Sequence, residues 1–163
     1  MHHRMNQERL ESLDRGQILA AVAKTFKERI PFNRILEFDI ELQKDGTARL
    51  SFQMRNELIG NFLRGNLHGG VISSSLDVVG GLVAFVALLD QNPVQSFNVG
   101  SEQFSNLGTV DLRIDFLRPG LGDSFVATGS ILRAGRRIAV ARMELHNDSG
   151  ALIAGGTGTY SIG

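Results

Sequence analysis

The stretch GNLHGGVISSSLDVVGGLVAFVALLD, residues 65–90, decides the fold, because a glycine-rich turn leads here into the most apolar segment of the chain. We expect a long helix over residues 69–90. It is apolar nearly all round, so other elements must enclose it to remove every face from water. Gly80 and Gly81 predict close packing of this helix against a sheet or another backbone. The acidic Asp77 in its first half therefore needs an explanation.

An ionised carboxylate on an enclosed helix is costly unless it has hydrogen-bond donors, takes up a proton or faces a pocket. A carboxylate in a cleft is a candidate general base or nucleophile. Alternatively, Asp77 reaches a polar edge of the protein and bonds the neighbouring Ser73 or Ser74. The residues alone leave both alternatives open.

Composition excludes several classes of protein. Seventeen basic residues balance seventeen acidic ones, so no overall field attracts nucleic acid or an anionic membrane surface. The absence of cysteine excludes disulfides, thiolate metal sites and a cysteine nucleophile. The charged start is no secretory signal, and the apolar run over residues 78–89 is shorter than the roughly 18 to 20 residues that a bilayer requires. We expect a cytoplasmic protein without nucleic-acid or membrane partners.

Apolar periodicity predicts the elements before the central helix. Ile18, Val22, Phe26 and Ile30 recur every four residues, which indicates an amphipathic helix within residues 10–30 that Pro31 ends. Residues 35–54 alternate between apolar and polar side chains on either side of Asp45–Gly46, which is typical of a β-hairpin. We expect one domain over residues 1–163, in which residues 1–32 form an N-terminal helical extension.

Strands dominate the chain after the central helix. Residues 91–108 predict a long loop, and residues 109–119 alternate cleanly as a strand. Three further strands, separated by turns at Ala134–Gly135 and at residues 147–150, predict an antiparallel meander. This order of elements indicates an α+β domain in which one sheet curls around one helix.

The turn at His68 precedes the helix, where amide N–H groups lack helical acceptors and the helix dipole is positive. The Gly70 N–H would suit the oxyanion of a thioester intermediate. The alternative is a glycine turn capped by a histidine, which the short motif by itself favours. For His68, orienting this loop is the preferred role over acting as a base.

Other catalytic chemistries have little support. Histidines do not pair with carboxylates at metal-ligand spacing, so we predict no metal. The serines at 73–75 lack a G-x-S-x-G elbow, which disfavours a serine triad, and no nucleotide-binding glycine motif is present. Arginine outnumbers lysine by 14 to 3, and Arg133, Arg136 and Arg137 lie around one turn. They form a candidate phosphate site or a solvated turn.

Taken together, these motifs resemble the hotdog-fold thioesterases of the phenylacetyl-CoA thioesterase and 4-hydroxybenzoyl-CoA thioesterase superfamily. The resemblance covers roughly residues 33–161 by element order. It is carried by NLHGGVISSSLD at residues 66–77, GTVDLRIDFLRPG at 108–120, GD at 122–123 and AGRR at 134–137. It implies an antiparallel β-sheet wrapped around a long central α-helix, with an extra N-terminal helix. It also implies a homodimer, or a dimer of dimers, with the active site between subunits.

The resemblance also implies roles for individual residues. Asp77 would be the base or the nucleophile, the Gly70 amide would polarise the thioester carbonyl, and His68 would fix the loop. Thr109 corresponds to a position that assists the attacking water. An asparagine that contacts the carboxylate or thioester would be Asn61, with Asn66 as a competitor.

The expected activity is acyl-CoA thioester hydrolysis to a free acid and coenzyme A, without a cofactor. Arg136 and Arg137 match a region that meets the CoA phosphates. Four phenylalanines suit a medium or long acyl chain, although core packing explains them equally well: Phe62, Phe85, Phe97 and Phe104. The alternative is an acyl-CoA-binding or sensing protein of the same fold without turnover. A hotdog dehydratase is disfavoured, because no second acid is suitably placed.

Overall fold

A computed structural model describes residues 14–91 and 105–163 of the chain. The N-terminal part forms α2 (Arg15–Arg29), α3 (Pro31–Ile35), β1 (Asp39–Leu42), β2 (Ala48–Gln53), the 3₁₀ helix η1 (Asn56–Leu58), β3 (Ile59–Asn61) and β4 (Asn66–Leu67). There follow α4 (Gly69–Gln91), β5 (Gly108–Phe116), β6 (Ser124–Ala134), β7 (Ile138–Asn147) and β8 (Leu152–Ser161). Most of the expected loop over residues 91–108 and the first residues of the expected N-terminal helix lie outside the described residues.

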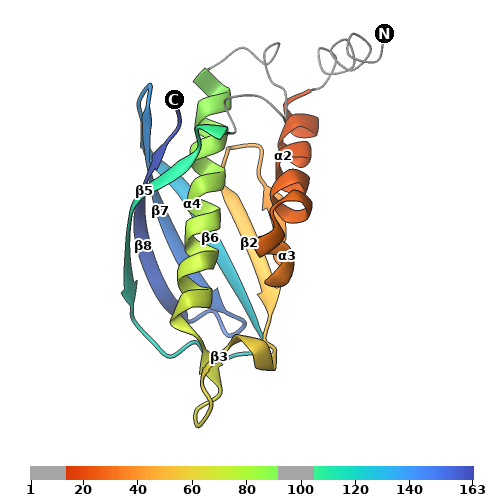
Figure 1. Cartoon of the computed structure of the whole chain (residues 1–163), viewed down its shortest axis with the longest axis vertical. Helices are drawn as coiled ribbons and strands as arrows, with labels where there is room; N and C mark the ends of the chain where they lie inside the picture. Colours follow the sequence, from red (N-terminus) through yellow and green to blue (C-terminus); the bar gives the residue numbers. More distant parts are fainter. Residues whose placement is uncertain (1–13, 92–104) are drawn as a thin grey trace.

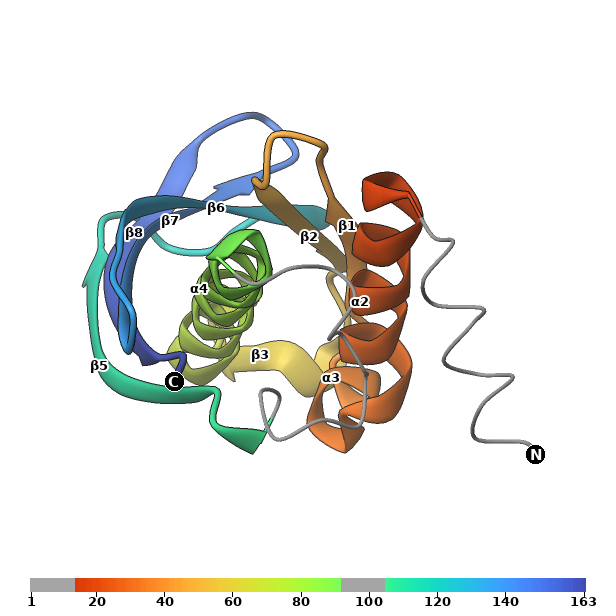
Figure 2. The same ribbon diagram turned by 90° about the horizontal axis from the view of Figure 1, so that it is seen from above.

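The six long strands form one antiparallel sheet in the order β1-β2-β6-β7-β8-β5, and this sheet curls around α4 (Figure 1). Figure 2 shows α4 inside the curve of the sheet, with α2 and α3 on its open side. The predicted hotdog architecture is therefore confirmed. The meander of β6, β7 and β8 is present as predicted, whereas β5 crosses to the far edge and pairs with β8.

The core forms between α4 and the concave face of the sheet. Leu76, Val79, Leu82, Val83 and Ala84 on α4 have no solvent-accessible surface. Among the described residues, α4 is the one helix long and apolar enough to cross a membrane, yet 72% of its most apolar window is buried within this chain. The sheet thus supplies the enclosure that this sequence requires.

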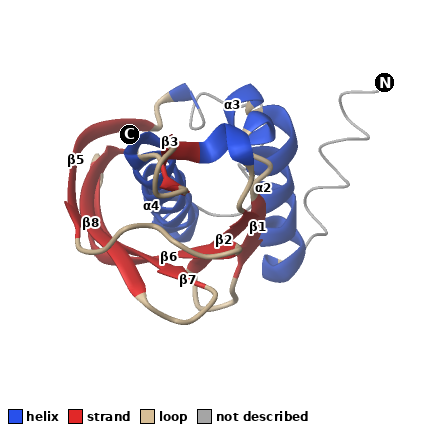
Figure 3. Cartoon of the chain, turned by 90° about the horizontal axis from the view of Figure 1, so that it is seen from below, coloured by secondary structure: helices blue, strands red, loops and turns tan. Residues whose placement is uncertain are grey.

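The helices α2 and α3 close the open side of the curve (Figure 3). The helix α2 begins with a capping box between Asp14 and Gln17 and packs beside the edge strand β1. Pro31 ends α2 as predicted but also starts α3, because its fixed φ and missing N–H suit the first position of a helix. The helical extension consequently reaches Ile35 instead of residue 32.

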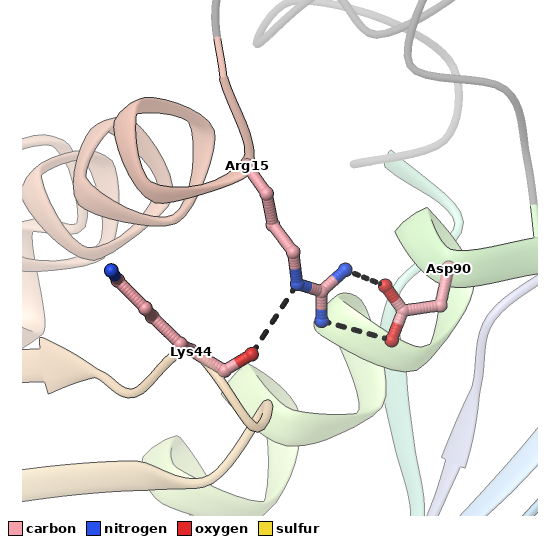
Figure 4. Close-up of polar contacts among 3 residues, drawn as sticks. All are labelled: Arg15, Lys44 and Asp90. Carbon is pink, nitrogen blue, oxygen red and sulfur yellow. Dashed lines mark hydrogen bonds and ion pairs between the residues drawn. The ribbon is translucent and has the colours of Figure 1, made fainter.

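The Arg15 guanidinium connects α2, the end of α4 and the turn between β1 and β2 (Figure 4). Arg15 at the start of α2 forms an ion pair with Asp90 in the last turn of α4. Its Nε also donates to the carbonyl oxygen of Lys44, in the turn between β1 and β2, at 3.4 Å. Both charged side chains are about half exposed, so the contribution of this ion pair to stability is small.

A side chain from β8 explains one of the two glycines in the middle of α4. A Cβ at Gly80 would lie 2.0 Å from the hydroxyl oxygen of Tyr160, and a Cβ at Gly158 would lie 2.6 Å from it. The nearest Tyr160 atom to a Cβ at Gly81 is 3.8 Å away, which is ordinary contact. The predicted close approach is therefore real, but an aromatic side chain makes it at Gly80.

The two glycines provide a matched test of this packing. Gly80→Ala should lower the free energy of unfolding by about 1 to 3 kcal/mol, because the added methyl group must displace the Tyr160 ring. Gly81→Ala should leave it unchanged or raise it by up to about 1 kcal/mol through helix propensity. Urea denaturation of both variants measures the difference, and equal stabilities would contradict the proposed packing.

Candidate active site

The carboxylate of Asp77 is held by the edge strand of the sheet. The Thr109 hydroxyl on β5 donates a hydrogen bond to Oδ1 of Asp77 at 2.9 Å, and Asp77 is partly exposed. The Ser73 and Ser74 hydroxyls donate instead to the carbonyl oxygens of Gly69 and Gly70, one helical turn earlier. The alternative in which these serines hold Asp77 is therefore not what the structure shows.

Tyr160 on β8 contacts the same turn of α4. Its hydroxyl donates to the backbone carbonyl oxygen of Asp77 at 3.2 Å. Thr109 and Tyr160 are direct cross-strand partners between β5 and β8. Two neighbouring strands therefore hold Asp77: β5 bonds the carboxylate of Asp77, and β8 bonds its backbone carbonyl oxygen. No sequence motif marks Tyr160; its usable signal is that it is the only tyrosine of the chain and lies in a strand rich in glycine.

His68 caps the start of α4. Its Nδ1 accepts a hydrogen bond from the Gly70 N–H at 2.8 Å, so the neutral ring carries its proton on Nε2. This contact agrees with the loop-orienting role expected for His68. Gly70 thus donates to His68 and is not a free donor for an oxyanion.

The amide of Gly69 is the better-placed donor at this helix start. The structure gives the Gly69 N–H no hydrogen-bond partner among the described residues. Gly69 also lines a cavity of about 390 Å³ at the head of α4. A helix N-terminus that opens into a cavity presents an unpaired donor to a bound group.

The cavity collects several candidates from different elements. Asn61 and Asn66 both line it, so the structure keeps both asparagines at the site. The Asn61 Oδ1 accepts from the Leu63 N–H at 3.0 Å, which leaves its amide NH₂ group for another contact. The lining also includes three residues that the sequence analysis did not single out: Arg64, Phe116 and Arg118. The sequence did not predict the short β3–β4 hairpin that carries Arg64.

Asp77 and Gly70 lie on one face of α4 but about two turns apart. Seven residues separate Gly70 from Asp77, which corresponds to a rise of about 10 Å and a rotation of nearly two full turns. The carbonyl carbon and oxygen of a thioester are only about 1.2 Å apart. One thioester group therefore does not contact both the carboxylate and the helix start of the same chain.

The remaining candidates separate into two groups. Arg136 and Arg137 are exposed in the β6–β7 turn, near the Thr109 end of β5, since Ile138 and Gly108 both pair with Ser161. Phe85 is buried in the core against Phe26, whereas Phe62 is 86% exposed at the β3–β4 hairpin. Phe97 and Phe104 lie outside the described residues. Within the described ranges, no three His, Asp or Glu side chains are grouped to hold a metal ion.

A sheet curled around one long helix (Figure 2) is the architecture of a hotdog-fold protein. The sequence model of the thioesterase superfamily matches residues 64–154. The chain belongs to this superfamily.

Individual relatives agree with this assignment. The chain is 44% identical to the medium/long-chain acyl-CoA thioesterase YigI of Escherichia coli K12, over 90% of this chain and 95% of the relative. It is 28% identical to acyl-coenzyme A thioesterase 13 of Mus musculus, over 90% and 96%. A crystal structure from Shewanella oneidensis, described as related to the thioesterase superfamily, superposes with a TM-score of 0.82 at 44% identity, covering 90% of this chain and 95% of that one.

The titration of Tyr160 tests the buried contact with Asp77. Burial, and then the negative charge of Asp77, raise the pKa of Tyr160 well above its ordinary value of 10.0. The unfolded chain loses this proton near pH 10 while the folded chain keeps it, so stability should fall as the pH rises above about 10. Absorbance near the phenolate band reports only Tyr160, because the chain has one tyrosine and no tryptophan. A native protein that titrates near 10 would contradict this contact.

Proposed function

We propose that this protein is an acyl-CoA thioesterase that releases a free acid and coenzyme A. The observation that carries the proposal is the partly exposed Asp77 carboxylate, which Thr109 holds about two helical turns from the cavity at the helix start. The 44% identity to YigI, named as a medium/long-chain acyl-CoA thioesterase, supports a medium or long aliphatic acyl group as the substrate.

We further propose that the active site combines two subunits of a homodimer, or of each dimer within a dimer of dimers. Among the described strands only β8 pairs with β5, so the other edge of β5 is free, and Val110 and Phe116 are exposed along it. A long exposed edge strand is a template for pairing with another chain. The edge strand β1, by contrast, lies beside α2.

Antiparallel pairing of two β5 strands would complete the site. Thr109 at one end of β5 lies beside Asp77, and Phe116 at the other end lies beside Gly69. A two-fold axis near the middle of β5 places the Asp77 end of one subunit opposite the Gly69 end of its partner. The separation of two helical turns within one chain is then no obstacle, because the two halves come from different chains.

The chemistry follows from this arrangement. Asp77 takes a proton from water, whose oxygen adds to the thioester carbon, or it attacks that carbon directly. The Gly69 N–H stabilises the oxyanion, while the neighbouring Gly70 N–H stays bonded to His68. When water attacks, the C–S bond then breaks and the CoA thiolate takes up the proton from Asp77. When Asp77 attacks directly, the breaking of the C–S bond leaves an acyl-aspartyl anhydride, and water hydrolyses it to the free acid, which restores Asp77 and supplies the proton to the thiolate. Thr109 orients the carboxylate and water, His68 fixes the helix start, and the Asn61 amide contacts the thioester.

The CoA moiety extends away from this centre in the proposal. Arg136 and Arg137 contact its phosphates, since their turn lies about two interstrand spacings, about 10 Å, from the Thr109 end of β5. The chain's own residues supply all of these groups, so we propose that no cofactor takes part. A cytoplasmic location would agree with an acyl-CoA substrate.

The first test removes the charge of Asp77 and keeps its shape. Asp77→Asn should lower kcat by about 10²-fold or more, because a neutral amide neither accepts the proton nor attacks the thioester. Asp39→Asn is the matched control, since that carboxylate pairs with Lys27 away from α4. Free-thiol release across acyl-CoA chain lengths measures both variants. An undiminished kcat in Asp77→Asn rejects the catalytic role of Asp77. If the wild-type protein binds acyl-CoA but does not hydrolyse it, the result favours the acyl-CoA-binding alternative.

The second test asks whether two subunits share one site. Gly69→Pro removes the proposed oxyanion donor at a helix position that tolerates proline, and Gly69→Ala keeps the N–H as its control. Each of Asp77→Asn and Gly69→Pro alone should be inactive. Refolded together at equal amounts, they should recover about one quarter of wild-type activity, because half the dimers are mixed and each contains one intact site. No recovery, with mixed dimers present, contradicts the shared site.

A further inference from the structure

We propose that Arg64 and Arg118 form a second phosphate-binding pair, which holds the CoA moiety from the subunit that supplies the helix start. This inference rests on the proposed thioesterase function and assigns a binding role to two residues that the family resemblance left without one. Both side chains line the cavity of about 390 Å³ at the head of α4. Arg64 comes from the β3–β4 hairpin and Arg118 from the segment after β5.

The charge of this cavity is one-sided. Its lining contains two arginines and two asparagines but no aspartate or glutamate. Neither Arg64 nor Arg118 has an ion pair among the described residues. Two unneutralised cations that face one cavity repel each other, and a bound anion relieves this repulsion.

Both arginines are attached to ordered backbone. Arg118 Nη1 donates to the carbonyl oxygen of Leu152 at 2.8 Å, which fixes the guanidinium beside β8 and leaves its other N–H groups available. Arg64 sits in a tight loop in which its own N–H and that of Gly65 both donate to the carbonyl oxygen of Asn61, at 3.1 and 2.8 Å. The backbone positions that carry both arginine side chains are therefore fixed before a ligand binds.

The ligand chemistry follows from the donor type and the position. Guanidinium groups bind phosphate oxygens in a two-pronged geometry that an ammonium group lacks. The acyl part of the substrate is apolar and its carboxylate forms only on hydrolysis, whereas the CoA part carries a diphosphate and a ribose phosphate throughout. The phosphates of CoA are therefore the anions that this pair fits.

The proposed dimer brings the two arginine pairs to one site. Arg118 follows the Phe116 end of β5, and Arg136 and Arg137 lie near its Thr109 end. Antiparallel pairing of β5 places these ends opposite each other, so Arg64 and Arg118 of one subunit face Arg136 and Arg137 of the partner subunit. One CoA moiety would then be held from both sides of the interface, like the thioester that it carries.

Truncated substrate tests this assignment. Arg64→Ala, Arg118→Ala and the double variant should raise KM for a medium-chain acyl-CoA, the double variant by about tenfold or more, with kcat little changed. The same variants should leave KM unchanged for the matching acyl-pantetheine, which has the thioester but lacks the nucleotide phosphates. Arg136→Ala should behave in the same way. Arg142→Ala is the control, because Arg142 lies on β7 in a separate hollow that also contains Glu144.

The outcomes are separable. Equal KM changes for acyl-CoA and acyl-pantetheine, or no change for either, overturn the phosphate assignment while turnover by the wild type keeps the thioesterase proposal. If the wild type hydrolyses neither substrate, the thioesterase proposal fails, and calorimetry with CoA and pantetheine still tests the arginines. Inhibition by inorganic diphosphate as strong as by adenosine bisphosphate would indicate a general anion site and overturn the assignment to CoA. If Arg118→Ala lowers the thermal midpoint, Arg64→Ala alone decides the result.

Discussion

Enclosure of α4 is the constraint on which the rest of the structure depends. The helix is apolar on almost every face, and an apolar surface of that size is unstable in water. The sheet therefore curls instead of lying flat, and six strands surround most of the helix. Only the face that carries Ser73, Ser74 and Asp77 remains partly open. The most hydrophobic element of the chain thereby determines where its most polar chemistry can be placed.

The sequence predicted the features that local patterns encode. Alternation at residues 39–53 and 109–116 identified strands, and the glycine-rich turn marked the start of α4 within one residue. The place of β5 at the far edge was not predictable in this way, because strand order is set by how a curled sheet closes and not by any local pattern. The β3–β4 hairpin was missed because its strands are too short to show alternation.

The candidate site likewise contains residues that local sequence patterns mark and residues that only tertiary contacts reveal. Asp77 and His68 were candidates from the sequence pattern and Thr109 from the family resemblance, and the structure joins Asp77 to Thr109 over 32 residues of chain. The direction of the hydrogen bond between His68 and Gly70 depends on how the ring turns, which no motif specifies. Tyr160 and Arg118 were missed because their significance lies in contacts across the sheet, with Asp77 and Leu152. A sequence identifies reactive groups more readily than the residues that hold them.

The aromatic ring between α4 and β8 links three positions that are distant in the chain. Gly80 and Gly158 have no room for a methyl group while Tyr160 occupies the space between them. Neither glycine is therefore free to vary by itself, and a smaller residue at position 160 would release both at once. We therefore expect related chains to keep all three residues or to exchange them together.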